Sequence, residues 1–393
     1  MNRRGFLHRC GAFGVALAGT SSLPMLSGCG SRSAMLRNPA LPDISFAGNA
    51  CGLPPVHVSA QREIRTVVGL RPYRPSGFVV RAERLGDTLV VHNYGHGGSG
   101  ITLSWGTSKL ALDIGAPGHR GPVAVLGSGA VGLANAALLQ EAGFDVTIYT
   151  RALPPHTTSN IAGGQWFPAF LSDHARRTPA FNAQLLAAAD YAYRRYQIMV
   201  GPRFGVRWMR NYYLSHEAFN ESGYIGMDSP LRDMMPEHRD LAAGEHPFAG
   251  YAHVRQFDTP MIEPPVYLAA MLDEFRLAGG RVRVGEITDL AALQALPEKL
   301  VFNCTGLGAK ALFDDDELTP VRGQLTILLP QPEVQYALLA GDLYMFSRSD
   351  GIVLGGTHEE GVWSLEPDLV RKQQILAGHQ ALFDGFRRCR ASA

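Results

Sequence analysis

Short apolar runs alternate with longer stretches of helical composition along most of the chain. Runs rich in Val, Ile and Leu predict strands at 64–68, 78–81, 88–92, 123–126, 146–149, 281–284, 300–303 and 323–329. Stretches of helical composition or amphipathic period predict helices at 133–142, 181–199, 266–278 and 369–388. Since strands and helices alternate through the middle of the chain, the pattern predicts an α/β fold.

The clearest local unit is a strand, a glycine-rich turn, a helix and a second strand over residues 123–149. In the turn GSGAVG, Gly127 suits the tight bend, Gly129 lets the backbone approach a pyrophosphate, and Gly132 lets the helix pack on the strand. The diphosphate would lie on the amides of Ala130 and Val131, where the helix dipole is positive. This unit predicts a dinucleotide site without choosing between NAD and FAD.

Two nearby patterns modify this prediction. The second strand ends in Thr150 and Arg151, without the acidic residue that usually binds the ribose hydroxyls, so Thr150 or backbone groups would take its place. The segment GHGGSG at 95–100 has the same glycine spelling, but the strand-like ITLSW follows it. We therefore expect 95–100 to be a loop that does not lead into a helix.

Composition limits the range of partners. The chain has 393 residues, 46% of them hydrophobic, and a formal net charge of +1. Such a chain can bury a large core and is expected to form two associated domains. Balanced charge without a block of like charges gives no reason to expect a nucleic-acid partner.

The amino terminus has the features of an export signal. Arg3 and Arg4 form a twin-arginine pair, and a weakly apolar run at 12–18 follows. Leu26 to Cys29 resemble a lipobox. Residues 1–28 would then be an export signal, Cys29 a lipid site and 29–60 a linker. The protein would be periplasmic and would contact the membrane only through its lipid anchor. The alternative is an ordinary cleaved signal in which Cys29 is incidental. The apolar run is too short to span a membrane, which takes ~20 residues.

The remaining cysteines have no metal-ligand spacing, and we expect no metal site. Cys51 and Cys389 lie near the two ends of the exported part, and an oxidising compartment would permit a bridge between them. Two unpaired thiols are the alternative.

Several longer segments resemble the D-amino acid oxidase family of FAD enzymes. They are TTSNIAGGQWFP at 157–168, NCTGLGAKAL at 303–312, RGQ at 322–324 and VLGGTHEEGVW at 353–363. GLRPYRP at 69–75 and HNYGHGGSGIT at 92–102 resemble the last part of the same family, yet here they precede the dinucleotide turn. The chain is therefore interpreted as a circularly permuted member, because termini that lie close together allow such a rearrangement.

The resemblance implies an FAD-binding Rossmann-like domain interleaved with a substrate domain built on a large mixed β-sheet. Residues 76–175 with 262–319 would form the first, and 61–75 with 176–261 and 320–393 the second. Arg71 matches the arginine that binds the substrate carboxylate, Gly98 the carbonyl that takes the amine, and Tyr251 and Tyr267 are candidates for the tyrosines over the substrate. The implied FAD contacts are Gly127, Gly129, Ala130, Val131, Gly132, Thr150, Arg151, Thr157, Thr158, Ser159, Gly163, Gly164, Gln165, Thr305, Gly306, Gly97, Gly98, Ser99, Gly100, Ile101 and Thr102.

The family activity is oxidative deamination of D-amino acids to 2-oxo acids and ammonia by hydride transfer to flavin N5. Electrons would pass to O2, forming H2O2, or to a membrane acceptor. Glycine or D-aspartate oxidation and a membrane-linked dehydrogenase are alternatives within the class; D-aspartate would require further cations, for which Arg203, Arg207 and Arg210 are candidates. A non-catalytic flavin-binding lipoprotein is the alternative from another class. We expect His96 to be a structural loop histidine and not a general base.

Overall fold

The computed structural model describes residues 50–386. The twin-arginine segment, the lipobox-like tetrad with Cys29, most of the proposed linker, and Cys389 lie outside the described residues. Within the described part, none of the helices has both the length and the apolar character that a bilayer crossing requires.

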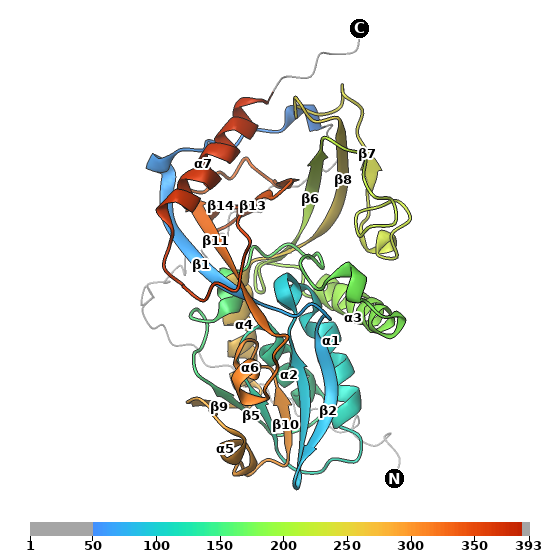
Figure 1. Ribbon diagram of the computed structural model, residues 1–393, viewed down its shortest axis with the longest axis vertical. Coiled ribbons are helices and arrows are strands. Elements are labelled where there is room, and N and C mark those ends of the chain that lie inside the picture. Colours follow the sequence, from blue (N-terminus) through green and yellow to red (C-terminus); the bar gives the residue numbers. More distant parts are fainter. Residues whose placement is uncertain (1–49, 387–393) are drawn as a thin grey trace, which may run out of the picture. The chain divides into compact units, whose positions relative to one another are not determined.

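A nine-stranded mixed sheet forms one part of the fold (Figure 1). Its main path runs β1-β11-β14-β13-β12-β6-β8-β7, and β15 pairs with β11 at the side. All neighbours are antiparallel except β6 and β12. The strands are β1 (Glu63–Tyr73), β6 (Val206–Ser215), β7 (Arg239–Asp240), β8 (His253–Ile262), β11 (Thr319–Leu328), β12 (Tyr336–Ala340), β13 (Leu343–Arg348), β14 (Gly351–Gly355) and β15 (Glu359–Glu360).

A six-stranded sheet forms the other part, in the order β2-β3-β10-β4-β5-β9. All of its neighbours are parallel except the β2 and β3 pair. The strands are β2 (Val79–Leu85), β3 (Thr88–Tyr94), β4 (Val123–Leu126), β5 (Val146–Thr150), β9 (Arg281–Val284) and β10 (Leu300–Asn303). The βαβ unit expected from the sequence is confirmed, because β4 and β5 are parallel neighbours joined by α2.

Strand β4 explains why the short apolar runs are continuous and do not alternate with polar residues. Val123 and Val125 join the large core cluster on one face of the sheet, whereas Ala124 and Leu126 join a second cluster on the other face. A parallel sheet covered on both faces requires apolar side chains at every position.

In the part of the chain that the structure describes, seven α-helices pack on these sheets: α1 (Gly100–Gly115), α2 (Ala130–Glu141), α3 (Pro179–Ile198), α4 (Pro264–Leu277), α5 (Leu290–Gln294), α6 (Gly308–Leu312) and α7 (Leu369–Asp384). The 3-10 helices are η1 (Ala50–Gly52), η2 (Ala60–Arg62), η3 (Gly97–Ser99), η4 (Thr158–Ile161), η5 (His174–Arg176) and η6 (Arg232–Met234). Helix α3 begins where the sequence provides a cap, because the Thr178 hydroxyl accepts from Phe181 N and Pro179 is the first helical residue. Helix α7 contacts β11, β13 and β14 of the nine-stranded sheet (Figure 1).

The expectation of a strand-like segment after GHGGSG was wrong, because α1 begins at Gly100. Its β-branched and aromatic residues suggested a strand, but Ile101 to Ser108 are all buried within a helix. Helix α1 packs very closely on α3: a Cβ added to Gly106 would lie 1.8 Å from the Ala188 carbonyl oxygen. Tertiary burial therefore overrides local propensity here.

The expected linker ends earlier than residue 60. Ala50 and Val56 are buried in the core beside the nine-stranded sheet, and the Tyr336 hydroxyl donates to the Pro54 carbonyl at 2.8 Å. Cys51 is disulfide-bonded, but Cys389 lies outside the described residues, so the pairing of these two stays a prediction. Cys304 is a free, buried thiol.

Candidate functional site

The six-stranded sheet brings several of the expected cofactor loops to one edge. Strands β3, β10, β4 and β5 are parallel, so the loops that follow them leave the sheet on the same side. These loops carry Gly95 to Ser99, Thr305 and Gly306, Gly127 to Gly129, and Arg151. Ligands of open α/β sheets bind outside the carboxyl ends of the strands, which is this edge.

The turn after β4 requires glycine for steric reasons. Gly127 has a φ of +100°, and a Cβ there would lie 2.6 Å from the Cys304 carbonyl oxygen. A Cβ on Gly132 would lie 2.1 Å from the Gly127 carbonyl oxygen, so the helix start packs directly on the turn. Gly129 is the N-cap of α2, and Ala130 and Val131 begin the helix.

The start of α2 can bind an anion because its first N–H groups have no partner within the helix. One of them, Ala130 N, donates to the Ser159 hydroxyl at 3.0 Å, which ties the expected diphosphate segment to the helix terminus. Ser159 lies in η4 beside Thr158. The Thr157 hydroxyl donates to Asn160 Oδ1 at 2.8 Å.

Two further observations at this edge fit a large polar ligand. The Nδ2 atom of Asn160 is buried and has no hydrogen-bond partner among residues 50–386, so a donor is available beside the 157–165 segment. A Cβ on Gly306 would meet no atom within 4 Å, so space is open at that turn. Together with the α2 terminus, these groups fit a dinucleotide.

The end of the site nearest β5 is built differently from the expectation. The Thr150 hydroxyl shares a hydrogen bond with Ser128 and donates to the Ala152 carbonyl at 2.8 Å, so it is already used within the protein. The Arg151 side chain is exposed and pairs with Glu286 at 3.4 Å.

The glycine-rich loop before α1 packs on the segment that follows Gly164 and Gln165. Gly98 N donates to the Phe170 carbonyl at 3.0 Å, and the Thr102 hydroxyl donates to the Phe167 carbonyl at 3.0 Å. A Cβ on Gly97, whose φ is +55°, would lie 2.0 Å from the Phe170 carbonyl oxygen. The tertiary structure thus joins two segments that are distant in the chain. The contact between Thr102 and Phe167 spans 65 residues, and the contact between Ser99 and Ala169 spans 70 residues.

Arg71 on β1 is held in a position to bind a carboxylate. Its Nη2 donates to the Tyr344 hydroxyl at 3.2 Å, and its Cζ lies 5.6 Å from the centre of the Phe170 ring. Its Nη1 is buried without a hydrogen-bond partner in the described part of the chain. Gly323 on the neighbouring strand leaves room for the guanidinium, because a Cβ there would lie 2.4 Å from Nη1. A buried donor of a permanently charged group without a partner indicates a site for an anionic ligand.

Tyr344 was not identified from the sequence. It alternates with Phe346 and Arg348 along β13, and this spacing places the three side chains on one face of the strand. The Tyr344 and Phe346 rings lie 5.3 Å apart, Phe346 covers Gly163, and Arg348 Nη1 donates to the Ala162 carbonyl at 2.9 Å. Arg71 is therefore linked to the 162–165 segment through two aromatic rings.

The two tyrosines suggested by the sequence lie elsewhere. Tyr251 packs in the core on the α7 side of the nine-stranded sheet and stacks on His216 at 4.7 Å. Tyr267 is fully buried on α4 against Tyr196, and burial raises the pKa of its phenol to about 12. Neither hydroxyl lies at the Arg71 site, because both segments fold into core packing that the sequence pattern could not distinguish from a ligand contact.

Phe170 and His358 were also missed. Their rings lie 4.6 Å apart, beside Arg71, and Phe170 has a φ of +49°. Burial lowers the pKa of His358, and the nearby Arg71 charge lowers it further. A non-glycine residue in this backbone region is uncommon and occurs often at ligand sites.

His96 is structural, as expected, although its partner is not the backbone. It is buried, its Nε2 lies 2.9 Å from the Thr107 hydroxyl, and burial lowers its pKa to about 3. The ring is therefore neutral. Among the described residues, no cluster of His, Cys, Asp and Glu side chains could hold a metal ion.

The three arginines considered for binding an acidic side chain already have partners. Arg203 pairs with Glu274 at the surface, and Arg210 pairs with Asp258. Arg207 Nη2 donates to the Ser347 carbonyl at 2.6 Å. None is available beside Arg71.

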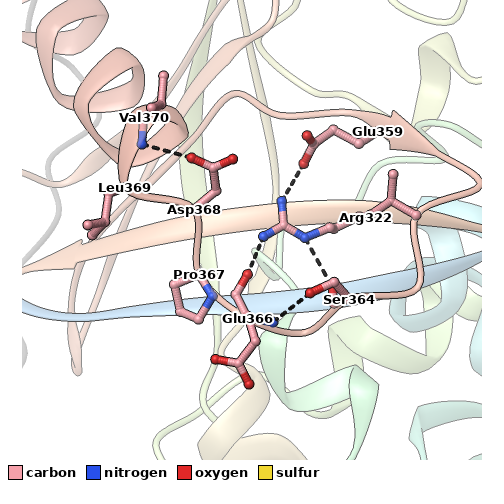
Figure 2. A pocket seen from close by; sticks show the side chains of 9 residues that line it. Arg322, Glu359, Ser364, Glu366, Pro367, Asp368, Leu369 and Val370 are labelled. Atoms are coloured by element: carbon pink, nitrogen blue, oxygen red, sulfur yellow. Dashed lines mark hydrogen bonds and ion pairs between the residues drawn. The ribbon is translucent and has the colours of Figure 1, made fainter.

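A cavity of about 460 Å³ lies away from this site, on the other face of β11 (Figure 2). Gly323 lies on the Arg71 face of the strand, so its neighbours Arg322 and Gln324 point to the opposite face. In Figure 2 the Arg322 guanidinium donates hydrogen bonds to the Glu359 carboxylate and to the backbone carbonyls of Ser364 and Glu366. The cavity therefore offers no free cation for a substrate.

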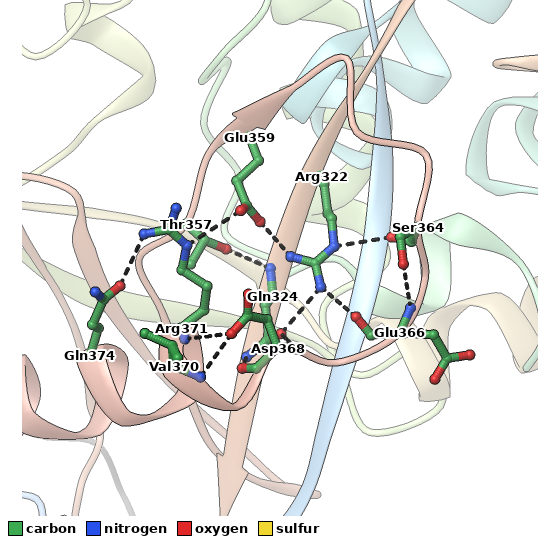
Figure 3. Close-up of polar contacts among 10 residues, drawn as sticks. All are labelled: Arg322, Gln324, Thr357, Glu359, Ser364, Glu366, Asp368, Val370, Arg371 and Gln374. Atoms are coloured by element: carbon green, nitrogen blue, oxygen red, sulfur yellow. Dashed lines mark hydrogen bonds and ion pairs between the residues drawn. The ribbon is translucent and has the colours of Figure 1, made fainter.

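The Arg322 contacts have a structural role. Arg322 is almost fully buried and binds the segment that leads to α7, and Gln324 exchanges two hydrogen bonds with the backbone of Asp368 (Figure 3). The Asp368 side chain caps α7. These contacts fix β11, and hence Gly323, beneath Arg71.

We expect Arg322→Leu to lower the free energy of unfolding by about 3 kcal/mol, because it leaves the half-buried Glu359 and two carbonyl groups without their buried cation. Denaturant unfolding of the purified protein measures this change. The matched control is Arg371→Leu, which removes a more exposed partner of the same carboxylate and should cost less than about 1 kcal/mol. Equal losses in the two variants would contradict the structural role of Arg322.

Tyr344→Phe should raise the KM for substrate about tenfold, because one hydrogen bond to a charged group is lost at the carboxylate site. The flavin content should stay unchanged. Tyr251→Phe removes a hydroxyl on the other face of the sheet and should leave KM as it is. Steady-state kinetics of both variants tests the reassignment, and a raised KM for Tyr251→Phe alone would reverse it.

Comparison with known proteins agrees with this geometry. Residues 122–392 match the model of the DAO family, described as FAD dependent oxidoreductase. A D-amino-acid oxidase of Streptomyces coelicolor is 33% identical over 256 residues, which cover 63% of this chain and 73% of the relative. A D-amino-acid oxidase of Rubrobacter xylanophilus is 34% identical over 290 residues, covering 70% of this chain and 82% of the relative.

Solved structures agree at the level of the fold. A glycine oxidase of Geobacillus kaustophilus has a TM-score of 0.52 and 18% sequence identity, and the match covers 70% of this chain and 81% of the other. The family match spans well over half of the sequence and includes the dinucleotide turn. The chain therefore belongs to the DAO family of FAD dependent oxidoreductases.

Proposed function

We propose that this protein oxidises D-amino acids with its FAD to 2-oxo acids and ammonia. The observation that carries the proposal is Arg71, whose buried Nη1 has no partner in the described part of the chain. A protein that only bound flavin would not need this carboxylate fork. The D-amino-acid oxidases among the relatives support the substrate class.

The side chains around Arg71 would orient the substrate. Arg71 binds the carboxylate through its two terminal nitrogens, and the Tyr344 hydroxyl adds a third hydrogen bond. The Gly98 carbonyl takes the substrate amine. Bound FAD would supply a two-electron acceptor for a hydride from the α-carbon. With loss of a proton from the amine, the substrate would become an imine, which water would hydrolyse to the 2-oxo acid and ammonia.

This reaction depends on position more than on acid and base side chains. Holding the carboxylate and the amine fixes the α-carbon, and such positioning can lower a barrier by several kcal/mol. His96 does not take part as a base, because its ring is buried, neutral and bonded to Thr107.

The direct test is anaerobic mixing of the purified yellow protein with matched D- and L-amino acids. Bleaching of the flavin by some D-isomers and by none of the L-isomers is expected. Flavin that stays yellow with every amino acid would favour a binding module without catalysis. Admitting O2 should then restore the colour and form one H2O2 per turnover; slow reoxidation without H2O2 would indicate a membrane acceptor.

Within this class, the structure does not favour D-aspartate as the substrate. That substrate needs a second cation for its side chain, and Arg203, Arg207 and Arg210 are engaged with other groups. A neutral side chain of the substrate fits the Phe170 and His358 rings better.

We infer that the chain is circularly permuted. The family match begins at residue 122, yet β1 and β3, which precede it, pair with β11 and β10 inside the two sheets. The end of α7 lies beside residues 55–62, since both line one cavity. Moving residues 61–121 to follow α7 should therefore give a protein that still binds FAD, measured by flavin absorbance; loss of soluble protein together with FAD would argue against the permutation.

We also propose export by the twin-arginine route, with a lipid on Cys29. The support is the sequence pattern of Arg3, Arg4 and Leu26 to Cys29. That route carries folded proteins and so allows FAD to be inserted first. Mass spectrometry of the mature protein tests the proposal, and an amino terminus other than diacylated Cys29 would reject it.

A further inference from the structure

A hydrogen-bonded chain runs from the surface to one of the cofactor turns. Glu83 on β2 lies 3.1 Å from Nε2 of His92 on β3, and Nδ1 of the same ring lies 3.1 Å from Asn303 Nδ2 on β10. Asn303 Oδ1 accepts from Thr305 N at 3.3 Å and from the Thr305 hydroxyl at 2.7 Å. His92 and Asn303 are fully buried, whereas the Glu83 side chain is 35% exposed. The substrate chemistry described above uses none of these contacts.

The backbone fixes the direction of every bond in this chain. Thr305 N is an amide and can only donate, so the Asn303 atom facing it must be Oδ1. Asn303 therefore presents its NH2 group to His92, and Nδ1 of the ring must accept. The proton of the neutral ring then lies on Nε2 and is donated to Glu83, so each donor in this series of hydrogen bonds faces an acceptor.

We propose that His92 is a positioning residue that holds the Thr305–Gly306 turn in its FAD-binding form through Asn303, and that protonation of His92 releases this turn and weakens FAD binding. The inference rests on the placement of FAD at this edge of the sheet.

The physical reason is a conflict between two donors. A proton on Nδ1 of His92 would face the NH2 group of Asn303. Rotation of the amide relieves the conflict, but it turns NH2 toward Thr305 N. The hydrogen bond that Thr305 N donates to Oδ1 is then lost, and the Thr305 hydroxyl must change from donor to acceptor. Because one hydrogen bond is lost and the Thr305 N–H is left without an acceptor, FAD should bind about tenfold more weakly to the protonated form.

The surroundings of His92 determine the pH range in which its ring becomes protonated. The edge of its ring packs on Phe313 at 4.5 Å and on Tyr94 at 5.8 Å. Burial lowers the pKa of His92 and Arg81 lowers it further, against the opposing effects of Glu83 and Asp315. Asp315 is also bound by Arg74 and by the Tyr94 hydroxyl, which reduces its influence.

The neutral ring therefore predominates at neutral pH. Release of the Thr305–Gly306 turn is expected below the ordinary histidine pKa of about 6.5. Because FAD prefers the neutral ring, FAD binding should in turn lower the His92 pKa and expel protons in that range.

The first experiment measures the FAD dissociation constant of the holoenzyme, by flavin fluorescence after dilution, from neutral to acidic pH. Wild-type protein should lose about tenfold in affinity as His92 titrates. His92→Gln keeps an acceptor for Asn303 and a donor for Glu83 without a titrating ring, so its affinity should stay near the neutral wild-type value throughout. In Asn303→Asp, the new carboxylate can accept hydrogen bonds from Thr305 and from charged His92 at the same time. The FAD affinity of this variant should therefore also lose its dependence on acidic pH. The control His119→Gln, on the loop after α1, should follow the wild-type curve.

The second readout is the nitrogen NMR spectrum of the holoenzyme labelled in histidine. It should show His92 protonated on Nε2 at neutral pH. A neutral ring protonated on Nδ1, or identical pH curves for wild-type and His92→Gln, would overturn the proposal. If His92→Gln does not fold, the proposal is tested by the pH dependence of FAD affinity in Asn303→Asp and by the tautomer of the neutral His92 ring in the wild-type protein. Failure to bind FAD at any pH would instead count against the proposed function.

Discussion

Arg71→Leu should lower kcat/KM for D-amino acids by about 10²- to 10³-fold, because a two-pronged charged hydrogen bond is removed from the substrate carboxylate. The loss should appear mainly in substrate binding. FAD should stay bound, since the contacts of Arg71 are with Tyr344 and Phe170 and not with the turns proposed to hold the diphosphate. Steady-state kinetics and the flavin absorbance of the purified variant measure the two effects.

The matched control is Arg65→Leu, the same change on the same strand. Arg65 is half exposed and pairs with Asp350 at the surface, so kcat/KM should stay within about twofold of wild-type. Arg71→Lys keeps the charge and loses the planar fork, and it should recover only part of the activity. Wild-type kinetics in Arg71→Leu would remove the carboxylate assignment and with it the main support for the proposed substrate class.

Gly127→Ala should abolish tight FAD binding. Its φ of +100° disfavours any side chain, and the new Cβ would lie 2.6 Å from the Cys304 carbonyl oxygen. The backbone must move at the point where the turn meets the start of α2, which removes the amides that would hold the diphosphate. The purified variant should be colourless and should rebind added FAD at least about 100-fold more weakly.

Gly118→Ala is the control that introduces backbone strain without a steric collision. Gly118 also has a positive φ, of +77°, but a Cβ there would meet nothing within 4 Å. This variant should lose about 1 kcal/mol of stability and keep its FAD. Equal flavin contents in the two variants would show that close packing at Gly127 does not matter for the cofactor.

The dinucleotide unit was accessible from sequence because its signals are local. A short apolar run, a GxGxxG turn and a helix follow one another, and each part has its own steric or electrostatic reason. The caps Thr178 before α3 and Asp368 before α7 are also local features, but neither was predicted from the sequence.

Helix α1 shows where local reasoning fails. Its first residues favour a strand by propensity, and the glycines before it suggest a loop. What makes it a helix is burial against α2, α3 and β3, including the close approach at Gly106. Propensity differences are small beside the burial of so many side chains, and burial depends on partners far away in the chain.

Tyr344, the tyrosine that contacts Arg71, was missed for a related reason. Tyr251, Tyr267 and Tyr344 are equivalent as residue types, and each lies in a mixed apolar and polar segment. Their roles differ only because Tyr344 faces Arg71, Tyr251 faces the α7 side and Tyr267 lies between helices. Which face a strand residue occupies depends on sheet register, and register across distant strands is not visible in a linear pattern.

The sequence by itself therefore determined the α/β class and the dinucleotide turn, and it led to the proposals that Arg71 binds the carboxylate and that the segments are permuted, because each depends on residues that are neighbours in the chain. The tertiary structure alone decided the Tyr344 partner, the Phe170 and His358 rings beside Arg71, and the chain from Glu83 to Thr305. Each of these joins residues from different strands or loops, and the sheet orders β1-β11-β14-β13 and β2-β3-β10 bring the strand residues within hydrogen-bonding or packing distance.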